Sequence, residues 1–230
     1  MSELTRKIKT AGYTDVSIHP GRFVKDRVQP ITSLFPLVQR AKVSLRGWDY
    51  PHLGRNAPEP VPEIDSVGVE SEWDSHLESW RAYQTGQFVC LRGMSYDWRD
   101  QSGFWPADAA WRRGDILTIE EALFTFAEIF EFAARLSNTA AGDDPMHVSI
   151  TFGGLRDRRL AVGDPRRMDF SETPRARLQE FPQQFVVPRA QLLAEPRALA
   201  IGGAQELFRR FGEDLSTDLL RDWLAQLIRR

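Results

Sequence analysis

A chain of 230 residues is long enough for one large domain or two small ones with a substantial buried core. Its 30 basic and 32 acidic residues leave a net charge of −2, so non-specific nucleic-acid binding would need a local basic patch. The single cysteine, Cys90, excludes an internal disulfide framework and a zinc site with several cysteine ligands. No run approaches about 18 apolar residues and the first residues lack a signal-peptide core, which predicts a cytoplasmic protein with no membrane partner.

The N-terminal part predicts short elements of both kinds. In chain order we expect a helix at 2–11, a strand at 13–18, a helix at 30–41 capped by Ser33, a strand at 42–48 and a proline-rich extended loop at 49–63.

The next stretch predicts a strand at 64–69, a helix at 71–84, a buried strand at 87–94 and an irregular segment at 96–114. The helix is expected because Trp73, Leu77 and Trp80 recur at helical spacing.

The stretch from Thr118 to Leu136 predicts the central core helix. Thr118 and Glu121 form an S/T-x-x-E capping pattern. Apolar residues then cover most of the circumference, so the helix must be covered on two sides. Five polar residues are expected to face water, namely Glu121, Thr125, Glu128, Glu131 and Arg135. Of these, Glu131 and Arg135 have the spacing of an i,i+4 ion pair.

The C-terminal part predicts a β-hairpin between strands 146–152 and 158–162, a strand at 181–187, a helix at 196–211 that stops at Gly212, and a last helix from Ser216. Strands and helices do not alternate regularly, so we predict an α+β fold. A mixed or antiparallel sheet would pack on the central helix at 118–136, with further helices at the C-terminus. We expect a single domain over 1–230, with the alternative of a sub-boundary near 138–146.

Catalytic and metal-binding signatures are missing from the sequence. Glu72 and His76 are four residues apart and would share a helical face, but a surface pair explains them more simply than a metal site. Cys90 lies in an apolar strand, where cysteine packs as a small hydrophobe. An acidic cluster between Glu63 and Asp74 has no lysine nearby to stabilise phosphoryl charge. We therefore predict no catalytic residue, no metal and no cofactor.

The strongest functional hint is a segment rich in tryptophan and arginine. Six of the seven tryptophans lie between Trp48 and Trp111. Tryptophan and arginine dominate binding hot spots, and aromatic rings also stack on unpaired bases. The candidate binding residues are Trp48, His52, Trp73, Trp80, Arg81, Trp98, Arg99, Trp105, Trp111 and Arg112. Of these, Trp98, Trp105 and Trp111 are expected to be partly exposed, and His52 belongs to a loop that could form the lip of a ligand site.

Five phrases together resemble a known bacterial module. They are RGWDYPHLG at 46–54, WRAYQTGQFVCLRGMSYDW at 80–98, FAEIFEFAARL at 126–136, ITFGGLRDRRL at 150–160 and ELFRRFG at 206–212. The chain resembles, over about residues 15–211, a module found beside Schlafen-type AlbA DNA-binding domains in proteins labelled transcriptional regulators or defence-associated. The resemblance implies an accessory or sensing role beside a separate effector, and it carries over no active-site residue.

Three hypotheses remain open from the sequence. The first is a non-enzymatic module that binds another protein, encoded nearby, in a bacterial regulatory or anti-phage assembly. The second is a nucleic-acid-binding subunit, in which arginines contact phosphate and tryptophans stack on bases. The third is a metal-dependent hydrolase. A homo- or hetero-oligomer is compatible with each of them.

Overall fold

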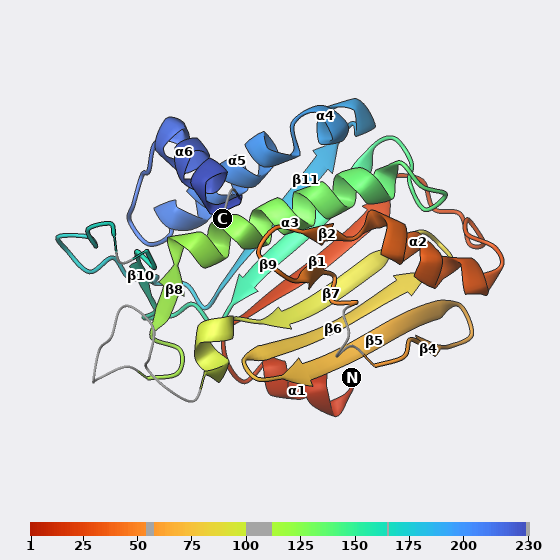
Figure 1. Ribbon diagram of the computed structural model, residues 1–230, viewed down its shortest axis with the longest axis horizontal. Coiled ribbons are helices and arrows are strands. Elements are labelled where there is room, and N and C mark those ends of the chain that lie inside the picture. Colours follow the sequence, from red (N-terminus) through yellow and green to blue (C-terminus); the bar gives the residue numbers. More distant parts are fainter. Residues whose placement is uncertain (54–57, 100–111, 165, 229–230) are drawn as a thin grey trace.

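The computed structural model describes residues 1–53, 58–99, 112–164 and 166–228 (Figure 1). Seven strands in this part form one antiparallel sheet in the order β11-β9-β1-β7-β6-β5-β4. These strands are β1 (Tyr13–Pro20), β4 (Val61–Pro62), β5 (Ser66–Trp73), β6 (His76–Tyr83), β7 (Phe88–Gly93), β9 (Met146–Gly153) and β11 (Glu180–Val187). The predicted α+β fold with a sheet packed on a central helix is confirmed.

The helices gather mainly on one face of this sheet (Figure 1). The central helix crosses the strands, and the C-terminal helices pack along it on the side away from β5 and β6. The helices are α1 (Glu3–Ile8), α2 (Leu34–Ala41), α3 (Ile119–Ser137), α4 (Arg189–Ala194), α5 (Pro196–Arg209) and α6 (Thr217–Ile228), with 3₁₀ turns η1 (Ile31–Ser33) and η2 (Ser95–Trp98). Helix α4 was not predicted. No helix in the described ranges has both the length and the apolar character that crossing a bilayer requires.

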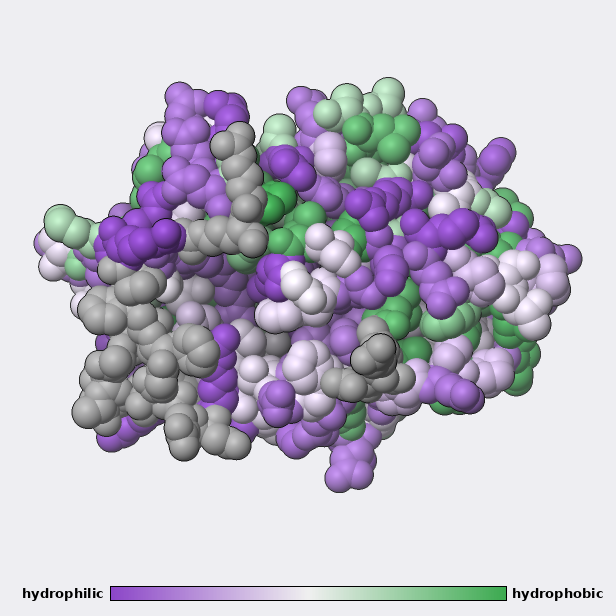
Figure 2. All heavy atoms as spheres, viewed as in Figure 1, coloured by the Kyte–Doolittle hydropathy of each residue, from purple (hydrophilic) through white to green (hydrophobic). Residues whose placement is uncertain are grey.

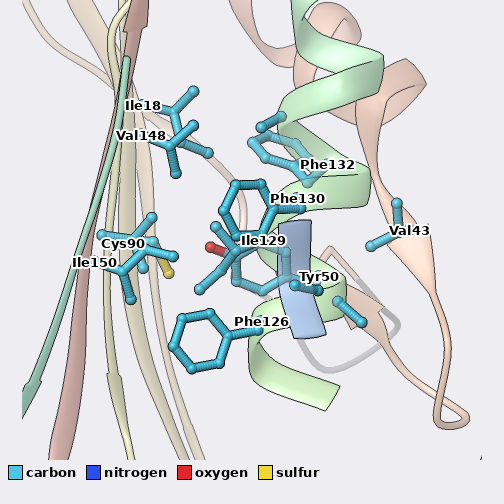
Figure 3. Packing of buried hydrophobic residues seen from close by; sticks show 14 of the residues in the cluster. Ile18, Val43, Tyr50, Cys90, Phe126, Ile129, Phe130, Phe132, Val148 and Ile150 are labelled. Carbon is cyan, nitrogen blue, oxygen red and sulfur yellow. The ribbon is translucent and has the colours of Figure 1, made fainter. Parts of the chain in front are cut away.

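Helix α3 is the core element that the sequence predicts. Its N-cap is Thr118, whose hydroxyl accepts a hydrogen bond from the backbone N–H of Glu121 at 3.2 Å. Figure 3 shows side chains of the sheet, among them Ile18 and Ile150, facing Phe126 and its neighbours on α3, while other buried residues lie on the far side of the helix. The helix is thus covered on two sides, as expected.

The polar side of α3 differs from the prediction. Glu128 and Thr125 are buried, where we expected them to face water. Glu131 accepts a hydrogen bond from Arg197 of α5 at 2.8 Å, and Arg135 donates to the carbonyl of Lys42, so the expected i,i+4 pair does not form. The helical period identified the polar positions, but it could not reveal that arginines from other segments reach over this side of the helix.

One glycine of α5 permits close packing on α3. A Cβ at Gly203 would come within 2.8 Å of the Phe126 ring. The Gly203 carbonyl also accepts a hydrogen bond from the buried Gln183 side chain of β11 at 3.0 Å. A glycine inside a helix is costly on propensity alone, and here the cost is offset by the approach of the two helices.

The predicted helix at 71–84 is wrong, because these residues form the β5–β6 hairpin. Trp73 pairs with His76 across a two-residue turn in which Asp74 adopts a positive φ of 46°. Both faces of β6 are covered here: Trp80 packs into the main core, and Leu77 packs into a second core beneath α1. Apolar residues therefore occur at both odd and even positions, which removes the period-two signal of a strand.

The predicted hairpin between 146–152 and 158–162 is also wrong. β9 lies between β1 and β11, whereas β10 (Arg159–Ala161) pairs in parallel with β8 (Ile116–Thr118). Gly154 and Asp157 have φ values of 69° and 62°, which turn the chain out of the sheet. Alternation identified both strands, but partner choice depended on contacts distant in the sequence.

Two further predictions at the N-terminal part need correction. In place of a strand at 42–48, a short ladder joins β2 (Val43–Ser44) to β3 (Asp49–Tyr50), and Gly47 turns the chain between them with φ 90°. Ser33 precedes α2, but its side chain makes no capping hydrogen bond. The segment between these short strands carries Arg46 and Trp48 toward the β5–β6 turn and the end of β7.

Candidate functional site

A buried carboxylate on α3 holds two arginines from different segments. Glu128 accepts hydrogen bonds from Nε and Nη2 of Arg46 and from Nη1 of Arg92, each at 2.8 Å. Arg92 also donates to the Thr125 hydroxyl at 2.8 Å. Burial alone would raise the pKa of Glu128, but the two guanidinium groups outweigh it and hold the pKa below its ordinary value. We call these four residues the Glu128 cluster; it contains two positive charges and one negative charge.

A second polar group lies against this cluster. The Tyr50–Pro51 segment brings His52 beside the hairpin turn, where its ring centroid is 5.1 Å from that of His76. The backbone N–H of His52 donates to Oε1 of Glu78 at 2.6 Å. Oε2 of Glu78 is 3.7 Å from Nε2 of His76, too far for a hydrogen bond. Neither atom finds a partner within the described chain.

Burial shifts the pKa values of this group in the directions that favour the neutral forms. It raises the pKa of Glu78 to about 7, with Arg92 opposing the shift. Burial also lowers the pKa of His76 to about 3, and the positive charges of Arg92 and Arg46 lower it further. The pKa of His52 is lowered by burial as well. The His76 ring therefore lies close enough to both arginines for their charges to disfavour its protonation.

Glu78→Gln is expected to raise stability relative to the wild type as the pH increases. A carboxyl with a raised pKa keeps its proton in the folded state, so wild-type stability falls as the pH rises from the unfolded value toward about 7. Glutamine removes this loss, worth about 1.4 kcal/mol for each pKa unit. The free energies of unfolding of both proteins are measured in urea at pH 5 and pH 8. His76 is present in both proteins, so its contribution cancels in the difference between them. A difference that is the same at both pH values would contradict the assignment.

A pocket of about 470 Å³ opens beside the Glu128 cluster. Its described walls come from the β2–β3 loop, the β5–β6 turn, the end of β7, the η2 turn and the first turn of α3. Three indoles line it, those of Trp48, Trp73 and Trp98, so we call it the indole pocket. Figure 2 shows that hydrophilic and hydrophobic residues are interspersed over this face of the molecule. Its size and mixed lining fit the range of small-ligand sites.

Both arginines of the Glu128 cluster line this pocket, and Arg46 also packs against the Trp48 ring. The Arg46 guanidinium lies 5.2 Å from the centroid of the Trp48 ring, which is 36% exposed. Trp73 stacks on His76 with ring centroids 5.3 Å apart. The Glu121 carboxylate, expected to complete the capping box, instead accepts from the backbone N–H and hydroxyl of Ser95 at 2.8 and 3.0 Å. One concave site thus combines the contact between Arg46 and the Trp48 indole with the two largely buried guanidinium groups of Arg46 and Arg92.

Five of the ten predicted binding residues lie at the indole pocket or directly behind it. Trp48, Trp73, Trp98 and Arg99 line the indole pocket, and His52 packs behind it against Trp73. Trp98 is buried, at 9% exposure, so the expectation that it is partly exposed is wrong. Its ring is covered by Arg113, whose guanidinium lies 3.9 Å from the ring centroid, and by Gly93.

The remaining predicted residues lie elsewhere. Trp80 is 2% exposed in the main core, where its indole donates to the carbonyl of His52 at 3.3 Å. Arg81 is on the opposite face of the sheet and forms an ion pair with Glu63. Arg112 is exposed, and Trp105 and Trp111 lie outside the described residues. Spacing along the chain therefore grouped residues that the sheet places on opposite faces.

Sequence reasoning missed Arg46, Arg92, Glu78 and Glu128. A signal did exist for two of them, because Arg92 interrupts an apolar strand and Glu128 interrupts an apolar helix. A charge within a buried run needs a buried partner. That rule pairs the two residues, although it does not reveal the pocket beside them.

The structure does not bring the other candidate catalytic or metal-binding residues together into a site. The acidic residues between 63 and 74 spread over β5 and its flanks, where Glu72 pairs with Lys7 and Glu70 accepts from Ser79 at 3.3 Å. Within the described ranges no three His, Cys, Asp or Glu residues have an arrangement that could hold a metal ion. Cys90 packs in the main core, as predicted, and burial raises the pKa of its thiol well above the ordinary value.

Comparison with known proteins adds no assignment. No family model matches the sequence, and neither a curated protein nor a solved structure gives a significant match.

Proposed function

We propose that this protein is a non-enzymatic accessory or sensing module that binds a partner protein at the indole pocket and its rim. The partner belongs, in this proposal, to a bacterial regulatory or anti-phage defence assembly. The observation that carries it is the open concave site in which Trp48, half-buried Trp73 and the guanidinium of Arg46 meet. Tryptophan and arginine are the residue types that contribute most to protein interfaces, and concave sites favour their desolvation.

Charge supports a protein partner over a nucleic acid. The backbone of a nucleic acid requires several accessible cations along its path. Here Arg46 and Arg92 are held by Glu128, and Arg81 is paired with Glu63 on the other face. Asp74 and Glu121 add negative charge to the pocket wall. The site therefore suits a neutral or singly charged group better than a chain of phosphates.

The Trp48→Ala substitution is expected to weaken partner binding by about 2 kcal/mol, roughly 30-fold, because it removes an exposed indole and the ring on which Arg46 packs. The wild-type protein would be co-expressed with the products of the flanking genes, and any complex would be measured by calorimetry. The matched control is Phe23→Ala, which removes a ring that is 77% exposed outside the indole pocket.

Three outcomes separate the hypotheses. Loss of binding in Trp48→Ala but not in Phe23→Ala, with a negative heat-capacity change and weak salt dependence, supports the proposal. Equal effects of the two substitutions place the interface elsewhere. Affinity for single-stranded nucleic acid that falls steeply with salt would replace the proposal with the nucleic-acid hypothesis.

A further inference from the structure

We infer that the indole pocket recognises a free carboxylate next to an aromatic ring, and that its occupant is the C-terminal aromatic residue of the partner protein. The carboxylate would lie against Arg46 and Arg92, and the ring between Trp48 and Trp73. This inference rests on the proposed function, because it names the group through which the partner is recognised.

The excess charge of the Glu128 cluster is the first argument. Two guanidinium groups share one carboxylate, and that carboxylate is fully buried. Nη1 of Arg46 makes no hydrogen bond within the described residues, while its Nε and Nη2 both donate to Glu128. Within the Glu128 cluster the guanidinium groups thus exceed the carboxylate by one positive charge, at the place where both arginines line the pocket. Glu78, whose pKa of about 7 leaves it only partly ionised at neutral pH, offsets this charge only in part. A buried or recessed charge is stabilised by a counter-ion, and guanidinium groups match the geometry of a carboxylate.

The other charged groups of the pocket limit the occupant to one negative charge. Glu121 is turned toward Ser95, and Arg99 lies over the Tyr96 ring at 4.3 Å from its centroid. Asp74 is at the hairpin turn and would repel a second negative group. A carboxylate carries a single charge at neutral pH, whereas a phosphate monoester carries nearly two. The balance of charges therefore favours a carboxylate.

The neutral aromatic wall is the second argument, and it is independent of the charge count. His76 is uncharged near neutral pH, and its ring packs on Trp73 with an angle of 29° between the two planes, so this wall is aromatic and carries no charge. Trp48 is the exposed indole on the rim. Aromatic rings placed against such walls gain contact area and an offset-stacked geometry. A volume of about 470 Å³ is large enough for an aromatic residue with its terminal carboxylate.

The test compares two probes that differ only in the terminal group, which is a charged carboxylate in one and a neutral carboxamide in the other. N-acetyl-phenylalanine and N-acetyl-phenylalanine amide are titrated into the purified protein and followed by tryptophan fluorescence and chemical-shift changes. The acid is expected to bind about tenfold or more tightly than the amide, which is the effect of one charged hydrogen bond. Equal affinities, or no binding of either probe at about 10 mM, would overturn the inference. Because no partner is present, this result is independent of whether a protein complex is found.

Two variants test whether the carboxylate of the probe binds in the indole pocket. Ser75→Asp adds a negative charge at the pocket wall without touching the Glu128 cluster, and should abolish the preference for the acid. Arg46→Gln should have the same effect, and a thermal melt checks that it folds. Arg221→Gln is the matched control, since Arg221 lies on α6 and pairs there with Asp218 at 2.5 Å. If the Ser75→Asp protein keeps the full preference for the acid, the carboxylate does not bind in the indole pocket.

Discussion

The Glu128→Ala protein is expected to lose about 3–5 kcal/mol of its free energy of unfolding, because two guanidinium groups are left in the interior without their counter-charge. Glu128 is fully buried, and its carboxylate accepts three hydrogen bonds of 2.8 Å. Removing the carboxylate costs more stability than the intact cluster contributes. Arg92 remains buried away from water, but the negative charge that stabilised it there is gone. Such a loss is a large part of the stability of a typical domain. Urea denaturation monitored by circular dichroism measures it.

A glutamate three residues further along the same helix serves as the control. Glu131 also accepts a hydrogen bond of 2.8 Å from an arginine, but its partner Arg197 is 53% exposed at the surface. Pairs of that kind contribute about 0–1 kcal/mol, so Glu131→Ala should lie close to the wild type. Similar losses in the two variants would mean that the Glu128 cluster is solvated in solution and has no special energetic role.

Asp97→Ala is expected to produce a loss of similar size, about 3–5 kcal/mol, for a related reason. The Asp97 carboxylate forms a two-pronged pair with the buried Arg158, with N–O distances of 2.8 and 2.7 Å. It also accepts the backbone N–H groups of Gly12 and Gly114 at 2.6 and 3.0 Å. One side chain in the η2 turn therefore joins three segments that are remote in sequence. Its removal leaves a buried charge and two amides without acceptors.

Thermal melts of three aspartate variants test this assignment. Asp97→Asn retains the shape and one acceptor oxygen, so it should fall between the wild type and Asp97→Ala. Asp218→Ala breaks an exposed pair with Arg221 and should leave the melting temperature nearly unchanged. If Asp97→Asn is as stable as the wild type, then the charge on Asp97 is not what holds the three segments together.

Several elements followed from the sequence because their signals are local. Thr118 and Glu121 marked the start of α3, and its apolar period predicted a helix covered on two sides. The strands β1, β7, β9 and β11 were predicted because period-two alternation or a continuous apolar run depends only on the strand's own residues. Gly212, with φ 94°, marked the end of α5 by the same kind of local constraint.

The hairpin of β5 and β6 and the site at its turn were decided only by tertiary structure. Leu77 and Trp80 are both buried because α1 covers one face of β6 and the main core covers the other, so the sequence pattern of β6 imitates a helix. Arg46, Arg92 and Glu128 lie 36 or more residues apart and meet only when the β2–β3 loop, β7 and α3 are packed together. Periodicity reports which face of an element is buried, but not what covers it. Partner choice, and with it the indole pocket, follows from contacts between distant segments that no local pattern encodes.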